Sequence, residues 1–364
     1  MDIEIENIKK KFVVPSRFEK SDEGIWNKST ALKLKYPCTD LSQGFPNYLI
    51  NESMVKMLQD VAKSENNVLH QYTRSSGHVR LVNALGVLYS TLLNRKLNAL
   101  TEIMVTVGAY EALYCAINGN IEIGDEVIVI EPAFDCYEPM VHVAGGIIRH
   151  IPLRKVCNSL HKSKETNPLT ESSADWKLNE NELRNLFNEN TKMIVINTPM
   201  NPIGKVFTKE ELTIIAELCI KYDVICVSDE VYEWMVYEPA KHVKIATLPG
   251  MWDRTITIGT AGKSFSVTGW KCGWAYAPSS LINNMRVIHM QNVYSCITPV
   301  QEAVARGTEK EIERLNSPDC IFNVSKKELQ SKRDYFIQLL MGSGFHPIIP
   351  EGGYFIIADW TNLS

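Results

Sequence analysis

The chain has 364 residues, of which 38 are basic and 42 acidic, so its formal net charge is −4. Hydrophobic residues make up 45% of the chain and charged residues 22%, which is typical of globular proteins. This balance argues against nucleic-acid and membrane-surface binding, and no apolar run is long enough to span a membrane. The length predicts a large domain accompanied by a smaller one.

The N-terminus and the cysteines bear on the compartment. Residues 1–6 are acidic, unlike a secretory signal or an arginine-rich mitochondrial presequence. We therefore expect a cytoplasmic protein, although an alternative start site could add a mitochondrial presequence. Nine cysteines are scattered without a Cys-x-x-Cys pair, so reduced thiols are expected and neither a disulfide framework nor a metal site is predicted.

The predicted elements divide the chain into three parts. Residues 1–45 lack a strand pattern and are expected to form an N-terminal arm with a segment of the smaller domain. Residues 46–298 alternate amphipathic helices with short β-branched runs, which predicts an α/β domain with a mainly parallel sheet and helices on both faces. The expected buried strands are 103–107, 127–130, 193–196, 224–227 and 255–258.

Two further segments differ from this alternation. Residues 157–176 are polar and without periodicity, so a surface excursion is expected. Residues 299–364 contain long charged helices followed by a strand-like run at 352–359, which predicts an incomplete C-terminal α+β domain.

Small and polar residues directly follow each predicted strand. In an open α/β sheet, ligands bind beyond the carboxyl ends of the strands, so these residues are expected to converge on one site. They are residues 108–110, 131–132, 197–202, 229–232 and 260–264.

Lys263 is the candidate reactive amine. A lysine after a strand is usually solvated, but the neighbours of Lys263 are small or hydroxylated, as a bulky cofactor beside an amine requires. A phosphate-binding Walker A loop is excluded because Thr257 stands where that motif needs glycine. A nicotinamide-linked oxidoreductase is also disfavoured, since no Gly-x-Gly-x-x-Gly turn is present.

Asp229 ends a buried strand, where a carboxylate is costly unless a cation pairs with it. It could be a helix N-cap or half of an internal ion pair, or it could face the protonated pyridine nitrogen of pyridoxal phosphate. Tyr232 could then donate to the phenolate oxygen of that cofactor. Gly108-Ala109-Tyr110 opens a helix whose free N–H groups would suit a phosphate, which is a weak signal alone.

Taken together, the motifs resemble kynurenine aminotransferases and glutamine transaminase K, which are fold type I pyridoxal-phosphate transferases. The resemblance runs from about Trp26 to Asp359. It is carried by Ser42-Gln43-Gly44-Phe45-Pro46, Gln71-Tyr72-Thr73, residues 105–110, Glu131-Pro132-Ala133-Phe134-Asp135-Cys136-Tyr137, residues 197–205, Asp229-Glu230-Val231-Tyr232-Glu233-Trp234 and the Ala-Gly-Lys-Ser-Phe-Ser stretch around Lys263.

The resemblance implies a role for each matching residue. Lys263 would be the Schiff-base lysine, Asp229 would pair with the pyridinium, and Asn201 and Tyr232 would hold the phenolate side while Phe134 stacks on the ring. The implied phosphate contacts are Gly108, Ala109, Tyr110, Thr260, Lys271 and, from a second subunit, Tyr72. The implied substrate contacts are Trp26, Gly44, Asn201 and, from the partner subunit, Tyr294.

The implied protein is a homodimeric aminotransferase of kynurenine, glutamine or aromatic and sulfur amino acids with 2-oxo acid acceptors. Cysteine-S-conjugate β-lyase chemistry is an implied side activity. Three departures from the family pattern are Ala109 in place of glycine, Ser295 in place of histidine, and the end at Ser364 before the family's carboxylate-binding arginine. The alternative is therefore a truncated, catalytically impaired form that binds the cofactor and acts only as a subunit partner.

Overall fold

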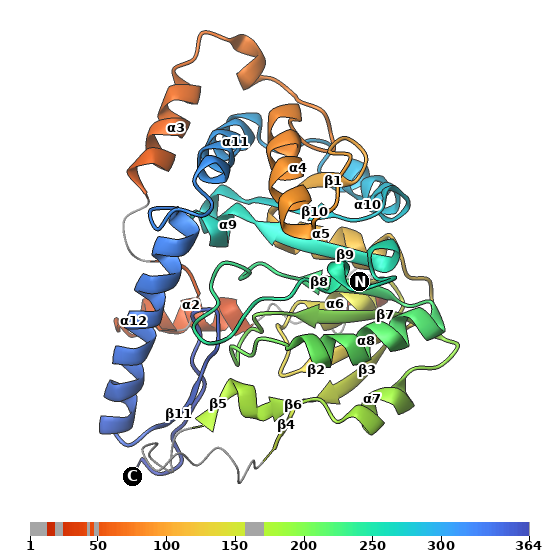
Figure 1. Ribbon diagram of the computed structural model, residues 1–364, viewed down its shortest axis with the longest axis vertical. Coiled ribbons are helices and arrows are strands. Elements are labelled where there is room, and N and C mark those ends of the chain that lie inside the picture. Colours follow the sequence, from red (N-terminus) through yellow and green to blue (C-terminus); the bar gives the residue numbers. More distant parts are fainter. Residues whose placement is uncertain (1–12, 19–24, 42–43, 47–50, 157–170, 364) are drawn as a thin grey trace, which may run out of the picture.

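A seven-stranded sheet forms the centre of the molecule in the computed structural model, which describes residues 13–18, 25–41, 44–46, 51–156 and 171–363 (Figure 1). Its strand order is β1-β10-β9-β8-β7-β2-β3. The strands from β9 to β3 are mutually parallel, and β10 is antiparallel to both β9 and β1. Their bounds are β1 Ile103–Val107, β2 Glu126–Glu131, β3 Ile147–Pro152, β7 Thr191–Asn197, β8 Ile225–Asp229, β9 Thr255–Thr260 and β10 Cys272–Tyr276.

All five predicted strands are present, and the expected mainly parallel α/β sheet is confirmed. Two strands of this sheet were not predicted. β10 reads Cys-Gly-Trp-Ala-Tyr, which contains no β-branched residue, and only its neighbours on both sides make it a strand. β3 is an edge strand in which only Ile151 is buried, so it lacks the continuous apolar run of a buried strand.

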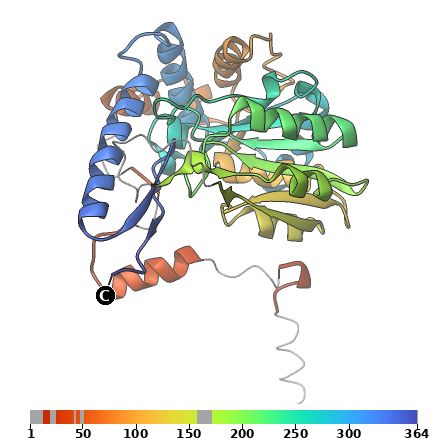
Figure 2. The same ribbon diagram turned by 60° about the horizontal axis from the view of Figure 1, so that its bottom comes forward.

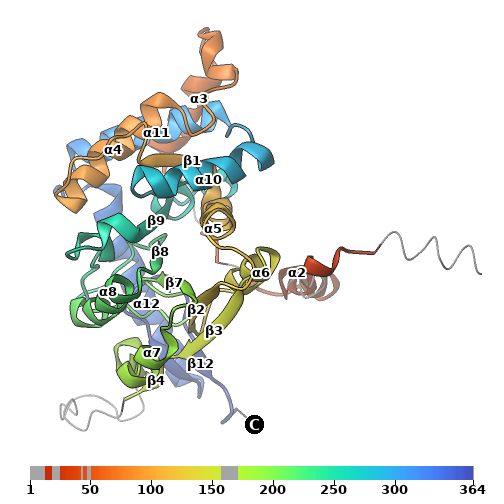
Figure 3. The same ribbon diagram turned by 90° about the vertical axis from the view of Figure 1, so that its right-hand side faces the viewer.

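Helices cover both faces of the sheet, as expected. Alternation along β2 sends Val127 and Val129 into one core cluster and Ile128 and Ile130 into another. Helices α5 and α6 lie on the first face and α8 on the opposite face (Figure 3). The bounds of the covering helices are α4 Val79–Leu93, α5 Gly108–Asn118, α6 Tyr137–Val143, α7 Glu180–Leu186, α8 Lys209–Tyr222, α10 Ser279–Asn292 and α11 Thr298–Glu313.

A smaller sheet lies beside the long helix α12, Ile321–Gly342 (Figure 1). It contains β12 (Ala358–Asp359), β11 (His346–Ile349) and β5 (Glu171–Ser172) in that order. A two-stranded ribbon pairs β4 (Arg154–Lys155) with β6 (Trp176–Lys177). These elements agree with a smaller α+β unit, while the predicted domain boundaries at 45/46 and 298/299 stay predictions.

Two local expectations need correction. Most of the predicted surface excursion at 157–176 lies outside the described residues, but within its described part, residues 171–176, Ser173 is fully buried. The strand expected over 352–359 is confined to Ala358–Asp359. The preceding residues instead turn back, because the Gly352 N–H donates to the Gly204 carbonyl and Gly353 takes a positive φ of 72°.

The arm expected over residues 1–45 stays a prediction, because much of that segment lies outside the described residues. Helix α3, Glu52–Ala62, packs on α11, whereas α2, Ile25–Lys35, lies apart from the main sheet (Figure 2). Within the described chain, no helix combines the length and the apolar character needed to cross a membrane. The eight cysteines among the described residues are all free thiols, in agreement with the expectation.

The start of α5 is pressed against β10. A Cβ atom on Gly273 would lie 2.4 Å from the carbonyl carbon of Gly108 and 2.6 Å from the nitrogen of Ala109. Gly108 itself has a φ of 74°, which favours glycine. The sequence therefore places the first turn of α5 directly beside the end of β9 and the start of β10.

Gly273→Ala should lower the free energy of unfolding by about 1–3 kcal/mol, because the added methyl group overlaps the backbone at the start of α5. Urea unfolding would measure this change. Gly342→Ala is the matched control, since a methyl group there would meet no neighbouring atom within 4 Å. Equal stability of the two variants would contradict the close approach.

Candidate active site

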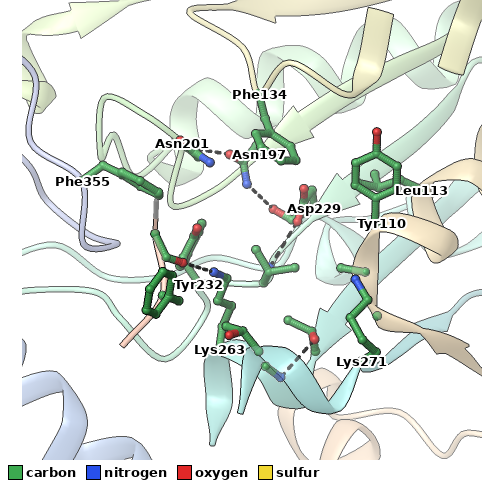
Figure 4. Close-up of a pocket in the computed structure, with 18 of the residues that line it drawn as sticks. Tyr110, Leu113, Phe134, Asn197, Asn201, Asp229, Tyr232, Lys263, Lys271 and Phe355 are labelled. Carbon is green, nitrogen blue, oxygen red and sulfur yellow. Dashed lines mark hydrogen bonds between the residues drawn. The ribbon is translucent and has the colours of Figure 1, made fainter. Parts of the chain in front are cut away.

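A cavity of about 470 Å³ opens beyond the carboxyl ends of β7, β8 and β9 (Figure 4). All but two of the residues predicted for the site line it. These are Trp26, Gly44, Gly108, Ala109, Tyr110, Phe134, Asn201, Asp229, Tyr232, Thr260, Lys263 and Lys271. The convergence expected from the strand ends is therefore present, since the parallel strands deliver their polar ends to one edge.

Asp229, the last residue of β8, is the buried acid of the cavity, with 4% of its surface exposed. Its Oδ2 accepts from the Tyr137 hydroxyl at 2.8 Å, and its Oδ1 accepts from the Val231 N–H at 3.3 Å. Burial raises the pKa of Asp229 to about 6, although both hydrogen bonds oppose this. Among the described residues it belongs to no ion pair, so the internal salt bridge considered above is not formed.

Asn197 and Asn201 line the cavity next to Asp229. The Asn197 side chain donates to the Asp229 carbonyl at 2.9 Å and accepts from the Asn201 N–H at 2.6 Å. One buried amide thus joins the end of β7, the end of β8 and the turn that carries Asn201 into the cavity. Asn197 was part of a predicted motif, but no role in the site was assigned to it.

Lys263 lies in α9, Ala261–Ser264, directly after β9. Its Nζ donates to the Gly44 carbonyl at 2.9 Å and is hydrogen-bonded to the Tyr354 hydroxyl. Burial lowers the pKa of Lys263 to about 8, although the nearby Asp229 carboxylate raises it. An amine with this pKa has a substantial neutral fraction near pH 7–8, as a nucleophile requires.

Sequence reasoning missed the contribution of Tyr354 and Phe355, which fell within a predicted strand. Phe355 lines the cavity, and the Tyr354 hydroxyl donates to the Gly44 carbonyl at 2.7 Å. A Cβ atom on Gly44 would lie 2.2 Å from the Phe355 ring. The available signal was the Gly-Gly pair before the two aromatic residues, because it favours a turn over a strand.

The opposite end of the cavity suits an anion. The first turn of α5 presents backbone N–H groups and the positive end of the helix dipole. A Cβ atom on Gly108 would lie 3.3 Å from Lys271 Nζ, so this amine reaches the same turn. Ala109 is not among the residues with positive φ, so its methyl group adds no strain. These groups could hold a phosphate.

Tyr72 and Tyr294 are the two predicted residues that do not line the cavity. They are 83% and 51% exposed, and their rings pack edge to face with centroids 5.6 Å apart. Trp26 does reach the cavity, where its Nε1 donates to Asp135 Oδ2 at 2.8 Å. This contact attaches α2 to the segment that carries Phe134.

The donor set fits pyridoxal phosphate. The buried carboxylate of Asp229 has no cationic partner among the described residues, and a pyridinium nitrogen would balance its charge. The same cavity contains the partly neutral amine of Lys263 and the first turn of α5, which could hold the phosphate. In Figure 4, Asp229, Tyr232, Lys263 and Lys271 point toward one common space. Phe134 lies at its wall, where an aromatic ring can stack on a planar ligand.

Comparisons with known proteins agree with this geometry. The family model described as aminotransferase class I and II matches residues 36–364. Kynurenine–oxoglutarate transaminase 3 of Rattus norvegicus is 48% identical over 354 residues, covering 97% of this chain and 76% of that protein. Kynurenine–oxoglutarate transaminase 1 of Mus musculus is 43% identical over 348 residues, covering 96% of this chain and 80% of that protein.

Two solved structures are also similar. A putative kynurenine aminotransferase of Saccharomyces cerevisiae has a TM-score of 0.85 and 30% identity, covering 96% of this chain and 81% of its own. N-succinyldiaminopimelate aminotransferase of Mycobacterium tuberculosis has a TM-score of 0.84 and 31% identity, covering 95% of this chain and 84% of its own.

Asp229→Asn should stabilise the ligand-free protein above pH 6 by on the order of 2–3 kcal/mol. Burial raises the pKa of Asp229 from 3.8 to about 6, so folding favours its protonated form and stability falls as the pH rises between these values. The gain should therefore vanish near pH 4. Urea unfolding at pH 4 and pH 8 would measure it, with the exposed Asp253→Asn as control. A gain that does not depend on pH would contradict the unpaired acid.

Proposed function

The chain belongs to the class I and II aminotransferase family, and from this membership we propose a kynurenine-type transaminase that uses a 2-oxo acid as amino acceptor. The family uses pyridoxal phosphate, so the chain is a pyridoxal-phosphate-dependent enzyme. The observation that carries the proposal is the pair formed by a buried, unpaired Asp229 and a partly neutral Lys263 facing one cavity. Nothing in the comparisons supports the alternative of an impaired partner subunit.

Pyridoxal phosphate, when bound, supplies an electron-withdrawing ring that accepts the charge left when an amino acid loses its α-proton. Asp229 would hold the proton on the ring nitrogen, and the Tyr137 hydroxyl keeps its carboxylate oriented. Asn201 and Tyr232 would orient the phenolate side. The first turn of α5, Thr260 and Lys271 would bind the phosphate, as the seat described above suggests.

Lys263 would move the protons of the reaction. Its Nζ is placed to remove the proton from the α-carbon of an amino acid and to return a proton on the product side. The lowered pKa of about 8 supports this role, because both the neutral and the protonated amine are accessible near neutral pH. Tyr354 and the Gly44 carbonyl hold Nζ at the cavity wall.

The proposed donors are kynurenine, glutamine and aromatic or sulfur amino acids. The names of the relatives support kynurenine as donor and oxoglutarate as acceptor. The aromatic residues Trp26, Phe45, Tyr110 and Phe355 line the cavity and would pack on an aromatic donor. Cysteine-S-conjugate β-lyase activity is a further proposal, since a carbanion beside a good β-leaving group eliminates readily.

We also propose that two copies of the chain assemble and complete each other's sites. The supporting observation is that Tyr72 and Tyr294 lie together on the surface, outside the cavity of their own chain. Tyr72 would reach the cofactor phosphate of the partner subunit, and Tyr294 its substrate.

Lys263→Ala should shift the cofactor absorbance band to that of unlinked pyridoxal phosphate, and borohydride should no longer fix the cofactor to the protein, because the amine that forms the covalent link is gone. Borohydride reduction of the wild-type protein followed by peptide mapping should find the cofactor on Lys263. Lys209→Ala, at an exposed lysine, should leave the band unchanged. Labelling at another lysine would refute the assignment.

Trp26→Leu should lower kcat/KM for kynurenine by about threefold to tenfold, the contribution of one aromatic pair, with a smaller effect on glutamine. Steady-state assays with each donor and oxoglutarate would test this difference. Asp135→Asn, which weakens the acceptor of the Trp26 Nε1 bond, should act in the same direction. An equal loss with both donors would show that Trp26 does not select the substrate side chain.

A further inference from the structure

A buried histidine joins three segments that are distant in the sequence. One of them is the first part of α5, where the proposed phosphate seat lies. His289 of α10 is 1% exposed. Its Nδ1 lies 2.7 Å from Glu111 Oε1, in the first part of α5, and its Nε2 lies 2.9 Å from the Ser75 carbonyl. Neither contact belongs to the residues assigned to the cofactor or the substrate.

The hydrogen bonds determine where the protons lie. The Ser75 carbonyl can only accept, so Nε2 carries a proton. A lone pair on Nδ1 would face a carboxylate oxygen at 2.7 Å, so a second proton must lie between Nδ1 and Glu111. Glu111 otherwise accepts, from the Val107 N–H at 2.7 Å and the Cys115 thiol at 3.3 Å. Because the Glu111 carboxylate also accepts from these two donors, the second proton is placed on Nδ1 of the imidazole.

No other ionised group balances Glu111 within this cluster. The thiols of Cys115 and Cys296 face the pair, and burial raises the pKa of both, so they remain neutral. The Cys296 thiol donates to the Val105 carbonyl. Because each of these donor and acceptor atoms already has a protein partner, the cluster works as a hydrogen-bonded charge pair and not as a metal site.

The charge of Glu111 matters because of its position. Its carboxylate accepts from the N–H of Val107, the residue before Gly108. Glu111 itself directly follows Tyr110 in the first part of α5. An uncompensated carboxylate there would repel an anion bound at the first turn of α5. The other side of the His289 ring holds the carbonyl of Ser75, in the same loop as the exposed Tyr72.

We propose that His289 is a positioning residue for the cofactor phosphate: its protonated ring cancels the charge of Glu111 beneath the phosphate seat and ties that seat to the Tyr72 loop. This inference rests on the proposed seating of the phosphate at Gly108, Ala109 and Tyr110.

A double-mutant cycle on pyridoxal phosphate affinity tests the charge role without using activity. His289→Gln, which leaves Glu111 uncompensated, should raise the dissociation constant about tenfold, within the range for a charge at a helix terminus. Glu111→Gln should change it less than about threefold, and the double variant should return to about the wild-type value. Absorbance titration of the apoprotein would give all four constants.

The outcomes separate this inference from its premise. A double variant that binds as weakly as His289→Gln would mean a purely structural role, and normal binding by His289→Gln would also overturn the proposal. Lys271→Met provides the reference for the seat itself. If Lys271→Met binds normally, the phosphate seat is wrong; if it binds weakly while His289→Gln does not, only the role of His289 fails.

Nitrogen NMR of histidine-labelled apoprotein gives a second measurement that does not depend on the cofactor. The ring of His289 should carry protons on both nitrogens, because its two partners are a carboxylate and a backbone carbonyl. Its signals should disappear in His289→Gln and shift in Glu111→Gln, and the latter variant alone suffices if the former does not fold. A singly protonated ring at His289 would overturn the proposal.

Discussion

The site depends on a carboxylate that is buried without a cation. Asp229 is 4% exposed, accepts two hydrogen bonds and belongs to no ion pair in the described part of the chain. Burial therefore raises its pKa to about 6, which disfavours the charged form that the role proposed for Asp229 needs. A pyridinium nitrogen in the cavity would reverse that penalty, so the free energy lost on folding is recovered when the cofactor binds.

The adjacent carboxylate shows the contrast. Glu230 is equally buried, and desolvation alone would raise its pKa, but Lys244 and His242 hold it at about 2. Two neighbouring acids thus have opposite environments: one is satisfied within the protein, and the other is left for a ligand. Diverging environments of this kind are what distinguish functional acids from structural ones.

The same contrast between acids recurs at the proposed phosphate seat. Glu111 is held within the protein by His289, Cys115 and the Val107 N–H, whereas the N–H groups of the following first turn and Lys271 face the cavity. Close packing of Gly273 against Gly108 fixes the turn in position. Rigid elements therefore carry the groups that bind, and compensated charges lie behind them.

The sequence by itself determined the five buried strands, the small and polar residues that follow them, and the family, because continuous apolar runs and local motifs are short-range patterns. It also identified Lys263 and Asp229, since both directly follow such runs. Only the tertiary structure showed that β3 and β10 are strands, that Tyr354 and Phe355 reach the cavity, and that His289 meets Glu111 and Ser75. Those features depend on burial and on pairing between segments far apart in the chain, and no local pattern records them.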